Sequence, residues 1–353
     1  MNTANPMGTA GFEFVEFASP NPNDLETLFS LFGFAPVAKH RSKNVTLWRQ
    51  GGINFIVNRE PGSEAEAFAK KHGPSACAIA FKVQNAEAAW KRAQELGAEP
   101  VVGRTGFMEI NLPGVRGVGG ATLYFIPQFT HTSIYDIDFE PIPGAEAAAA
   151  QNDCGLREID HCTHNVVQGQ MDRWAQFYEK LFNFREIRYF DIKGSFTGLH
   201  SRAMSSPDGK IRIPINESSD DKSQIVEFIH QYNGEGIQHI ALATDDIFGT
   251  VEKLRARGIK LLDTPDAYYR MLPNRLPGHG EDTERLQKNR ILVDGDPQNN
   301  GGLLLQIFTT PIIGPIFIEI IQRKGNQGFG EGNFKALFES MEQDQIDRGT
   351  LKV

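Results

Sequence analysis

Cysteine is scarce in this chain of 353 residues: Cys77, Cys154 and Cys162 are the only three. Three scattered thiols are too few for a disulfide framework or a zinc ribbon. The sequence opens without a basic, apolar leader, so we expect no signal peptide and a cytoplasmic protein. The most apolar stretch, residues 311–321, is shorter than the roughly 20 apolar residues that a membrane-spanning helix needs.

An excess of basic residues is also lacking. The formal net charge is −8 and the isoelectric point is about 5.7, which argues against binding to nucleic acid or to an anionic membrane. Hydrophobic residues make up 40% and charged residues 23%, values typical of globular proteins, and the length suits two domains. Phenylalanine is abundant, with 25 residues, which indicates an aromatic core or an aromatic-lined substrate pocket.

The chain contains an internal duplication. Each half has the pattern strand, helix and several strands, given twice, which indicates two βαβββ modules per half. We therefore expect an α+β fold of two domains, each an open, barrel-like curved sheet with helices outside. The segments that carry the likeness are 11–18 and 155–162, 28–34 and 177–184, 73–81 and 234–242, and 86–97 and 247–258.

Three segments lie outside this repeat. The small-residue stretch 144–153 is expected to be a partly helical linker between domains 1–150 and 151–353. Residues 263–300 are rich in proline, asparagine and charge, and we expect an insertion loop there. Residues 333–348 have apolar side chains at helical spacing after a glycine-rich approach, so they form either a lid or a packed terminal helix, with Asn333 as the expected N-cap.

Three residues of the second half are unusual for the apolar strands that contain them: His161, His239 and Glu319. A bare carboxylate in an apolar strand is costly to bury unless it is paired or bound to a metal. Strict alternation places His161 on the same strand face as Ile159 and Thr163. We expect all three unusual residues to face the inside of their curved sheet.

The duplication offers an internal control. Aligning the halves by sequence sets Phe17 opposite His161 and Ala78 opposite His239, and it sets Tyr124 or a close neighbour opposite Glu319. The first half therefore has no ligand-type residue in these strands. A metal site in the second half alone explains all three residues, whereas the alternative is a set of hydrogen-bonded core residues.

The ligand types narrow the choice of metal. Two imidazoles and one carboxylate leave up to three positions open, which suits Fe(II) enzymes that bind a chelating substrate together with O₂. Fe(II) is thus the expected cofactor. Zn²⁺ with two histidines and a glutamate is also chemically possible, as is Mn²⁺.

Several longer motifs carry a family resemblance. Segments 160–163, 212–217, 236–241, 304–309, 317–325 and 328–338 closely resemble 4-hydroxyphenylpyruvate dioxygenase, a family of the vicinal-oxygen-chelate superfamily. The likeness covers nearly the whole chain. It implies conversion of 4-hydroxyphenylpyruvate and O₂ to homogentisate and CO₂ in tyrosine catabolism, by oxidative decarboxylation, ring hydroxylation and side-chain migration. It also implies that His161, His239 and Glu319 bind the iron.

The resemblance implies further roles by motif position. The first domain would serve structure and assembly in a homo-oligomer, a tetramer or a dimer. Phe308 and Phe334 would flank the substrate ring, and Gln306 and Phe334 would act in catalysis. The implied substrate-binding residues are Ser201, Asn216, Gln238, Gln306, Phe308 and Phe334, and the implied gate comprises Phe329, Asn333, Leu337 and Phe338.

Three rival functions remain. Hydroxymandelate synthase uses the same substrate and ligands, but Phe334 and Pro214 favour the dioxygenase. An extradiol catechol dioxygenase shares the fold and the ligand types, yet it needs a histidine acid/base beside the iron that we cannot assign here. A protein that only binds small molecules is the third, although such superfamily members lack the metal triad.

Overall fold

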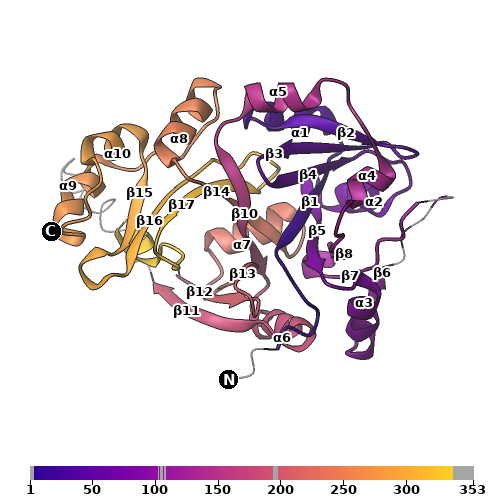
Figure 1. Ribbon diagram of the computed structural model, residues 1–353. Helices are drawn as coiled ribbons and strands as arrows, with labels where there is room; N and C mark the ends of the chain where they lie inside the picture. The colour runs from indigo at the N-terminus through magenta and orange to yellow at the C-terminus, as the bar shows by residue number, and fades with distance from the viewer. Residues whose placement is uncertain (1–3, 102, 104–105, 107–108, 194–197, 337–353) are drawn as a thin grey trace.

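The computed structural model describes residues 4–101, 103, 106, 109–193 and 198–336, and it consists of two curved β-sheets with helices around them (Figure 1). The first half contains β1 (Phe12–Ala18), α1 (Pro22–Leu31), β2 (Ala35–His40), β3 (Val45–Gln50), β4 (Ile53–Asn58), α2 (Glu64–His72), β5 (Ser75–Val83), α3 (Ala86–Glu95), β6 (Pro100–Val101), β7 (Gly114–Arg116), β8 (Thr122–Pro127), α4 (Ile134–Asp138), β9 (Phe139–Pro141) and α5 (Ala145–Asn152).

The second half contains β10 (Leu156–Val166), α6 (Met171–Phe182), β11 (Arg185–Lys193), β12 (Gly198–Ser205), β13 (Arg212–Ser218), α7 (Gln224–Tyr232), β14 (Gly236–Thr244), α8 (Ile247–Ala256), α9 (Asp266–Arg275), α10 (Thr283–Asn289), β15 (Leu292–Asp296), β16 (Gly302–Phe308) and β17 (Phe317–Lys324). The sheet orders are β6-β7-β8-β5-β1-β4-β3-β2-β9 and β11-β12-β13-β10-β14-β17-β16-β15. The expected α+β architecture of two curved sheets is confirmed.

Local sequence signals explain several element ends. The Ser63 side chain accepts a hydrogen bond from the backbone N–H of Glu66 and caps α2, and Asp246 caps α8 through Gly249 in the same way. Helices α6 and α7 end at asparagines with positive φ, Asn183 and Asn233, a conformation that asparagine tolerates better than most residues. The two N-caps mark where α2 and α8 begin, and the two asparagines mark where the chain turns from α6 and α7 into the next strand.

The connecting segments match the expectations only in part. The linker is helical over Ala145–Asn152, as its alanines indicate. The expected insertion loop at 263–300 is wrong, because this segment forms α9, α10 and the edge strand β15. Tyr268, Leu272 and Leu286 are buried there, so its apolar residues pack even though proline and charged residues surround them.

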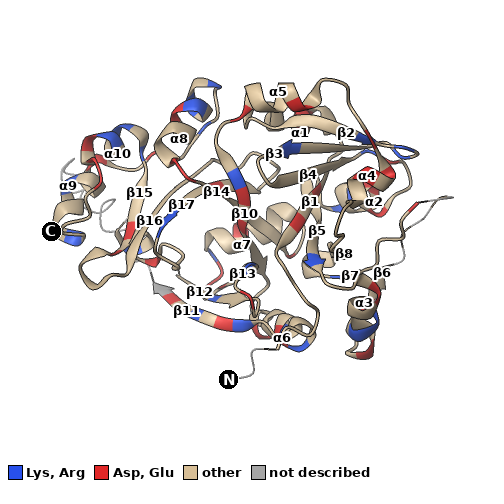
Figure 2. Ribbon diagram, viewed as in Figure 1, with Lys and Arg blue, Asp and Glu red and all other residues tan. Residues whose placement is uncertain are grey.

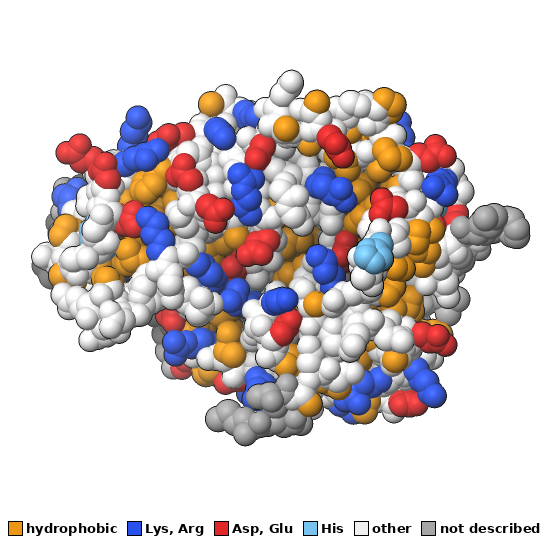
Figure 3. Space-filling view, viewed as in Figure 1, with side chains coloured by type: hydrophobic (Ala, Val, Ile, Leu, Met, Phe, Trp, Pro, Cys, Tyr) orange, Lys and Arg blue, Asp and Glu red, His pale blue; other side chains and the backbone are white. Residues whose placement is uncertain are grey.

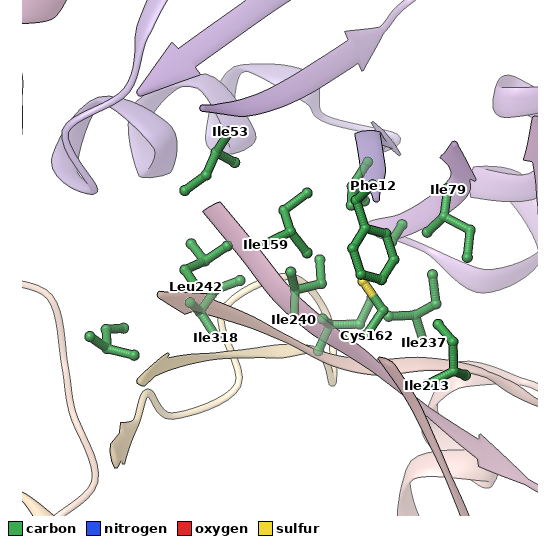
Figure 4. Packing of buried hydrophobic residues seen from close by; sticks show 14 of the residues in the cluster. Phe12, Ile53, Ile79, Ile159, Cys162, Ile213, Ile237, Ile240, Leu242 and Ile318 are labelled. Carbon is green, nitrogen blue, oxygen red and sulfur yellow. The ribbon is translucent and has the colours of Figure 1, made fainter. Parts of the chain in front are cut away.

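The two sheets pack against each other through a shared core (Figure 4). Ile79 and Phe12 of the first sheet face Ile159, Cys162 and Ile240 of the second. A further aromatic contact joins the halves, since the ring of Phe81 lies 5.5 Å from Phe182 and 6.1 Å from Phe184, measured between centroids. One face of each sheet therefore belongs to the common core, which leaves the opposite face of each sheet available for a site.

Helices α2 and α7 meet where the halves join. The Nδ1 atom of His72 lies 2.6 Å from the carbonyl oxygen of Tyr232, and the two rings are 4.6 Å apart. The ring of Tyr232 in turn stacks on Phe228 at 4.9 Å. These contacts fix α2 of the first half against α7 of the second.

The duplication is visible in the strand register. Phe14 and Tyr124 both pair with Ala80 of β5, while His161 and Glu319 both pair with Ala241 of β14. The sequence alignment of Phe17 with His161 is therefore wrong by three residues, and Phe14 is the structural counterpart. The error comes from the pairing of segment 11–18 with segment 155–162, an offset of 144 positions, whereas the strand register relates β1 to β10 by an offset of 147.

Charged side chains of both signs are scattered over both halves (Figure 2). On the face seen in Figure 3, lysines and arginines alternate with aspartates and glutamates without forming a region of one sign. None of the helices in the described part of the chain is long and apolar enough to cross a membrane.

Candidate metal centre

His161, His239 and Glu319 converge on the inner face of the second sheet. They lie on β10, β14 and β17, three adjacent strands, and each offers one ligand atom within 4.8 Å of the others. Oε2 of Glu319 is 3.2 Å from Nε2 of His161 and 3.3 Å from Nε2 of His239. The two Nε2 atoms are 3.4 Å apart. The sequence prediction that these residues share one site therefore agrees with their geometry.

A register shift in β10 shapes the site. It falls between Ile159 and His161, so Ile159 points into the shared core while His161 points to the other side. The expectation that Ile159 shares a face with His161 is wrong for this reason. The extra residue, Asp160, is buried beside His161, and its Oδ1 lies 2.8 Å from His161 Nδ1. Shifts of this kind commonly re-aim side chains at functional sites.

Both imidazoles are oriented by acceptors at Nδ1. Asp160 occupies this position on His161, and Gln238 Oε1 lies 2.9 Å from Nδ1 of His239. With the Nδ1 proton donated to these oxygens, Nε2 of each ring presents a lone pair to the centre, as a metal ligand requires. The donor set and its orientation fit a divalent metal ion bound by two imidazoles and a carboxylate.

The electrostatics of the triad are those of a coupled buried group. Burial alone would raise the pKa of Glu319, but the adjacent His161 and His239 bring that pKa down to about 2. Burial would lower the pKa of His161, yet Glu319 and Asp160 hold it above its usual value. The carboxylate is therefore ionised at neutral pH, ready to bind a cation.

Two arginines connect Asp160 to the segment that follows β17. Arg323 donates to Asp160 from Nε at 2.7 Å, and its NH1 donates to the carbonyl oxygen of Gly328 at 2.7 Å. Arg212 lies 3.5 Å from Asp160 and donates to Gln327 Oε1 at 2.7 Å. Asp160 is 5% exposed, so these bonds form in a low-dielectric setting where charged hydrogen bonds are strong. They join Asp160, and through it the imidazole of His161, to the residues around 328.

A cavity of about 480 Å³ opens in front of the triad. Its wall is mostly apolar with a few polar groups, the composition that small-molecule sites usually have. Of the residues predicted to contact substrate, five line it: Ser201, Asn216, Gln238, Phe308 and Phe334. Residues that the sequence prediction missed include Thr163, Leu199, Ile225, Phe228, Gln231, Leu262 and Phe317.

Gln306 is the exception among the predicted residues, since it does not line the cavity. It is buried, and its Oε1 has no hydrogen-bond partner among the described residues. Gly330 covers it: φ is +75° there, and an added Cβ would lie 2.0 Å from Gln306 Oε1. Any other residue would be strained by the positive φ and would displace the end of the Gln306 side chain, so glycine is favoured at this position.

Of the predicted gate residues that the structure describes, Phe329 lines the cavity and Asn333 does not. The ring of Phe329 is 5.4 Å from that of His161, and Phe329 and Phe334 both line the cavity. Asn333 is buried, and its Oδ1 accepts a 2.6 Å hydrogen bond from Tyr268. The helix begins at Glu331, so Asn333 lies inside it and is not the N-cap that the sequence indicated. Leu337 and Phe338 lie outside the described residues.

Comparison with known proteins shows the same family over the whole chain. Residues 3–140 match the profile of "Hydroxyphenylpyruvate dioxygenase, HPPD, N-terminal", and residues 158–271 match that of the glyoxalase/bleomycin resistance protein/dioxygenase superfamily. The chain is 57% identical to 4-hydroxyphenylpyruvate dioxygenase of Pseudomonas aeruginosa, over 98% of this chain and 97% of that one.

Two further relatives carry different names. Hemolysin VllY of Vibrio vulnificus is 60% identical, over 99% of each chain. A solved structure, a triple mutant of 4-hydroxymandelate synthase from Streptomyces coelicolor, superimposes with a TM-score of 0.80 at 27% identity, over 96% of this chain and 100% of that one.

Proposed function

The chain belongs to the 4-hydroxyphenylpyruvate dioxygenase family, and on that premise we propose that it converts 4-hydroxyphenylpyruvate and O₂ to homogentisate and CO₂ in tyrosine catabolism. We propose Fe(II) as the metal, with His161, His239 and Glu319 as its ligands. The observation that carries the proposal is the convergence of these three ligand atoms at the wall of a cavity with an aromatic lining. Fe(II) would supply the activation of O₂ and a binding point for the 2-oxo acid of the substrate.

The protein's own residues bind and orient the substrate. Phe308 and Phe334 line the cavity and would contact the faces of the phenol ring, where offset aromatic contacts are favourable. Ser201 and Asn216 face each other in register on β12 and β13 and offer polar atoms to the substrate. Gln238 holds the ring of His239 by one of its atoms, which leaves its amide NH₂ group for a substrate oxygen.

Segment 328–336 would exclude water from the reaction. Phe329 and Phe334 bring apolar rings to the mouth of the cavity, next to the triad. Exclusion of water protects a reactive intermediate and strengthens polar contacts inside. In the present conformation Gly330 covers Gln306, so the proposed catalytic contact between Gln306 and substrate requires this segment to move. Gln306 Oε1 has no hydrogen-bond partner among the described residues, and we take this as support for such a movement.

We propose a cytoplasmic homo-oligomer, a dimer or a tetramer, in which residues 1–150 serve structure and assembly and residues 151–353 carry the reaction. In the first half Leu31 is exposed at 36% and Phe129 at 37%, so apolar side chains of this half are available for subunit contact. Light scattering on the eluted protein measures the mass directly, and a monomer at micromolar concentration would contradict the assembly.

An oxygen electrode tests the proposed reaction. Purified protein loaded with Fe(II) is expected to consume O₂ with 4-hydroxyphenylpyruvate, and mass spectrometry of the product is expected to give homogentisate. His161→Ala should abolish both signals. Activity that survives in this variant would contradict the assignment of His161 as a metal ligand. Iron-loaded wild type without activity would contradict 4-hydroxyphenylpyruvate as the substrate.

Hydroxymandelate synthase is the second candidate, because a solved structure of that enzyme shares the fold over the whole chain. Both reactions start from the same substrate, so O₂ uptake alone does not separate them. The product does: hydroxymandelate in place of homogentisate would favour the second candidate. Phe334, which lines the cavity beside the triad, is the residue on which we base the preference for the dioxygenase.

A further inference from the structure

The first half contains a second cavity, of about 230 Å³, between α2 and the inner face of its sheet. Strand register shows that it corresponds to the cavity of the metal centre. Ala78 takes the place of His239, Tyr124 that of Glu319, and Glu16 that of Thr163. Helix α2 lies over this cavity as α7 lies over the other. The duplicated site has lost its metal ligands, yet it has not been filled.

Glu16 is a buried carboxylate on the sheet side of this cavity. It is 7% exposed, and its Oε1 accepts a hydrogen bond from Asn58 Nδ2 at 2.7 Å. Within the described ranges no lysine, arginine or histidine forms an ion pair with it, and Lys43 acts on it only from a distance. A buried carboxylate without a cationic partner is costly, and burial raises the pKa of Glu16 accordingly. Among the described residues Glu16 has hydrogen-bond partners in Asn58 and Cys77 but no cationic one, and a bound cation would favour its ionised form.

The rest of the lining suits a small organic cation. Phe68 and Tyr124 place aromatic rings in the lining, and such rings attract ammonium groups; the ring of Phe68 also packs on that of His72, 4.3 Å between centroids. His72 is 5% exposed, and its Nε2 has no hydrogen-bond partner among the described residues, while its Nδ1 is held by the Tyr232 carbonyl. At the rim Arg116 pairs with Glu64 at 2.6 Å, so the entrance carries both signs of charge. A metal cluster is not formed here by the described residues.

We propose that this cavity is a binding site for a small molecule with a primary ammonium group, for which Glu16 is the counter-ion. The volume lies below the roughly 300–1,000 Å³ of drug-sized ligand pockets, so the ligand is small. A free aliphatic amine and a small α-amino acid share the ammonium group. They differ at the carboxylate, which in an amino acid would meet Arg116 or Lys71 at the rim. The site is separate from the proposed reaction and does not depend on it.

Calorimetric titration of the full-length protein tests the proposal with three probes: propylamine, alanine and propionate. Propylamine or alanine is expected to bind and propionate is not. Tighter binding of alanine indicates an amino acid as the natural class, and tighter binding of propylamine indicates a simple amine. If neither amine binds, the proposal is wrong.

Matched variants locate the binding. Glu16→Gln should weaken binding of the amine at least tenfold. Glu319→Gln neutralises the buried carboxylate of the other cavity and should leave the affinity for the amine unchanged. The reverse pattern would overturn the proposal. Ala67→Trp, a change at an exposed residue on the cavity lining, keeps Glu16 and should also abolish binding. Unaltered circular dichroism of each variant confirms that the fold is intact.

Discussion

The strands of the two halves pair in nearly the same register, but the side chains at the corresponding positions differ in kind. In the second half His161 and Glu319 flank Ala241, and in the first half Phe14 and Tyr124 flank Ala80. The rings of Phe14 and Tyr124 are 5.9 Å apart and belong to an apolar cluster where the metal ligands would be. The comparison teaches that the curved sheet supplies only the positions. On the proposed ligand assignment, three side chains at those positions distinguish the half that binds a metal from the half that does not.

His239→Ala makes the second half like the first at one of these positions, and it has the largest expected effect. Loss of one metal ligand should lower kcat/KM about a thousandfold or more, because the metal contributes several kcal/mol to the transition state. Fe(II) content, measured after dialysis, should fall in parallel. Tyr124→Phe, at the counterpart of Glu319, is the control and should retain activity and iron. An equal loss in both variants would contradict the division of labour between the halves.

Arg323→Gln addresses a feature found in the second half only, the pairing of Asp160 with two arginines. Asp160 would lose its best donor and would hold His161 less firmly. Residues that orient a metal ligand typically contribute 10- to 100-fold to metal affinity or activity, and we expect about that loss. The measurement is the Fe(II) dissociation constant of the metal-free protein. Arg173→Gln, at an exposed arginine of α6, should leave it unchanged.

Gly330→Ala tests the segment that closes the cavity. The added Cβ would meet Gln306 in a backbone conformation that already disfavours side chains, so the segment should shift. We expect kcat/KM to fall about tenfold, which corresponds to about 1.4 kcal/mol. Gly325→Ala is the matched control, since φ is also positive there but the nearest atom is 3.6 Å away. If the two variants behave alike, backbone strain and not the contact with Gln306 is responsible.

The contributions of the two buried carboxylates to stability should change with pH in opposite directions. These are the smallest of the expected effects. The pKa of Glu319 is lowered to about 2, so its contribution to stability is present above its ordinary value of 4.5 and is lost as pH falls toward 2. The pKa of Glu16 is raised, so its contribution is present below 4.5 and is lost as pH rises through the folded pKa.

Urea unfolding of the metal-free protein measures this difference. Glu319→Gln should destabilise at pH 7, by about 1–2 kcal/mol, with the difference shrinking below pH 4.5. Glu16→Gln should equal or exceed the wild type in stability at pH 7 and lose that advantage below pH 4.5. Parallel pH profiles for the two variants would show that the two carboxylates have the same environment. That result would contradict a lowered pKa for Glu319 together with a raised pKa for Glu16.

Much of the fold and the centre of the site could be predicted from the sequence. Apolar periodicity and glycines at helix ends indicate the repeat, and ligand-type residues are easily noticed in apolar strands. Strand register was harder, because the shift before His161 inserts one residue and breaks alternation. For that reason alternation predicts the wrong face for Ile159. The misplacement of Phe17 has a different cause, because short apolar segments align almost equally well at offsets of 144 and 147 positions.

Contacts between distant segments could not be predicted from the sequence. Gln306 shares a strand with Phe308, but only the fold shows that Gly330 covers it. Ile225 and Phe228 of α7 line the cavity because of the way this helix crosses the sheet, and no local sequence pattern reveals that crossing. Asp160 stands next to His161 and could have been noticed as a neighbour, whereas its partner Arg323 is set by tertiary structure alone.

The pairing of Asp160 with Arg323 joins residues 163 positions apart, and this has a consequence for synthesis. At about 5–20 residues per second, a ribosome needs roughly 10–30 seconds to add the residues between them. At the start of that time all residues of the first sheet have been made, while Asp160 in β10 has no partner; β14 follows about halfway through, and β17 comes only at the end. The first half thus offers the nascent second half a finished apolar face to fold on, and the metal centre is among the last parts of the chain to form.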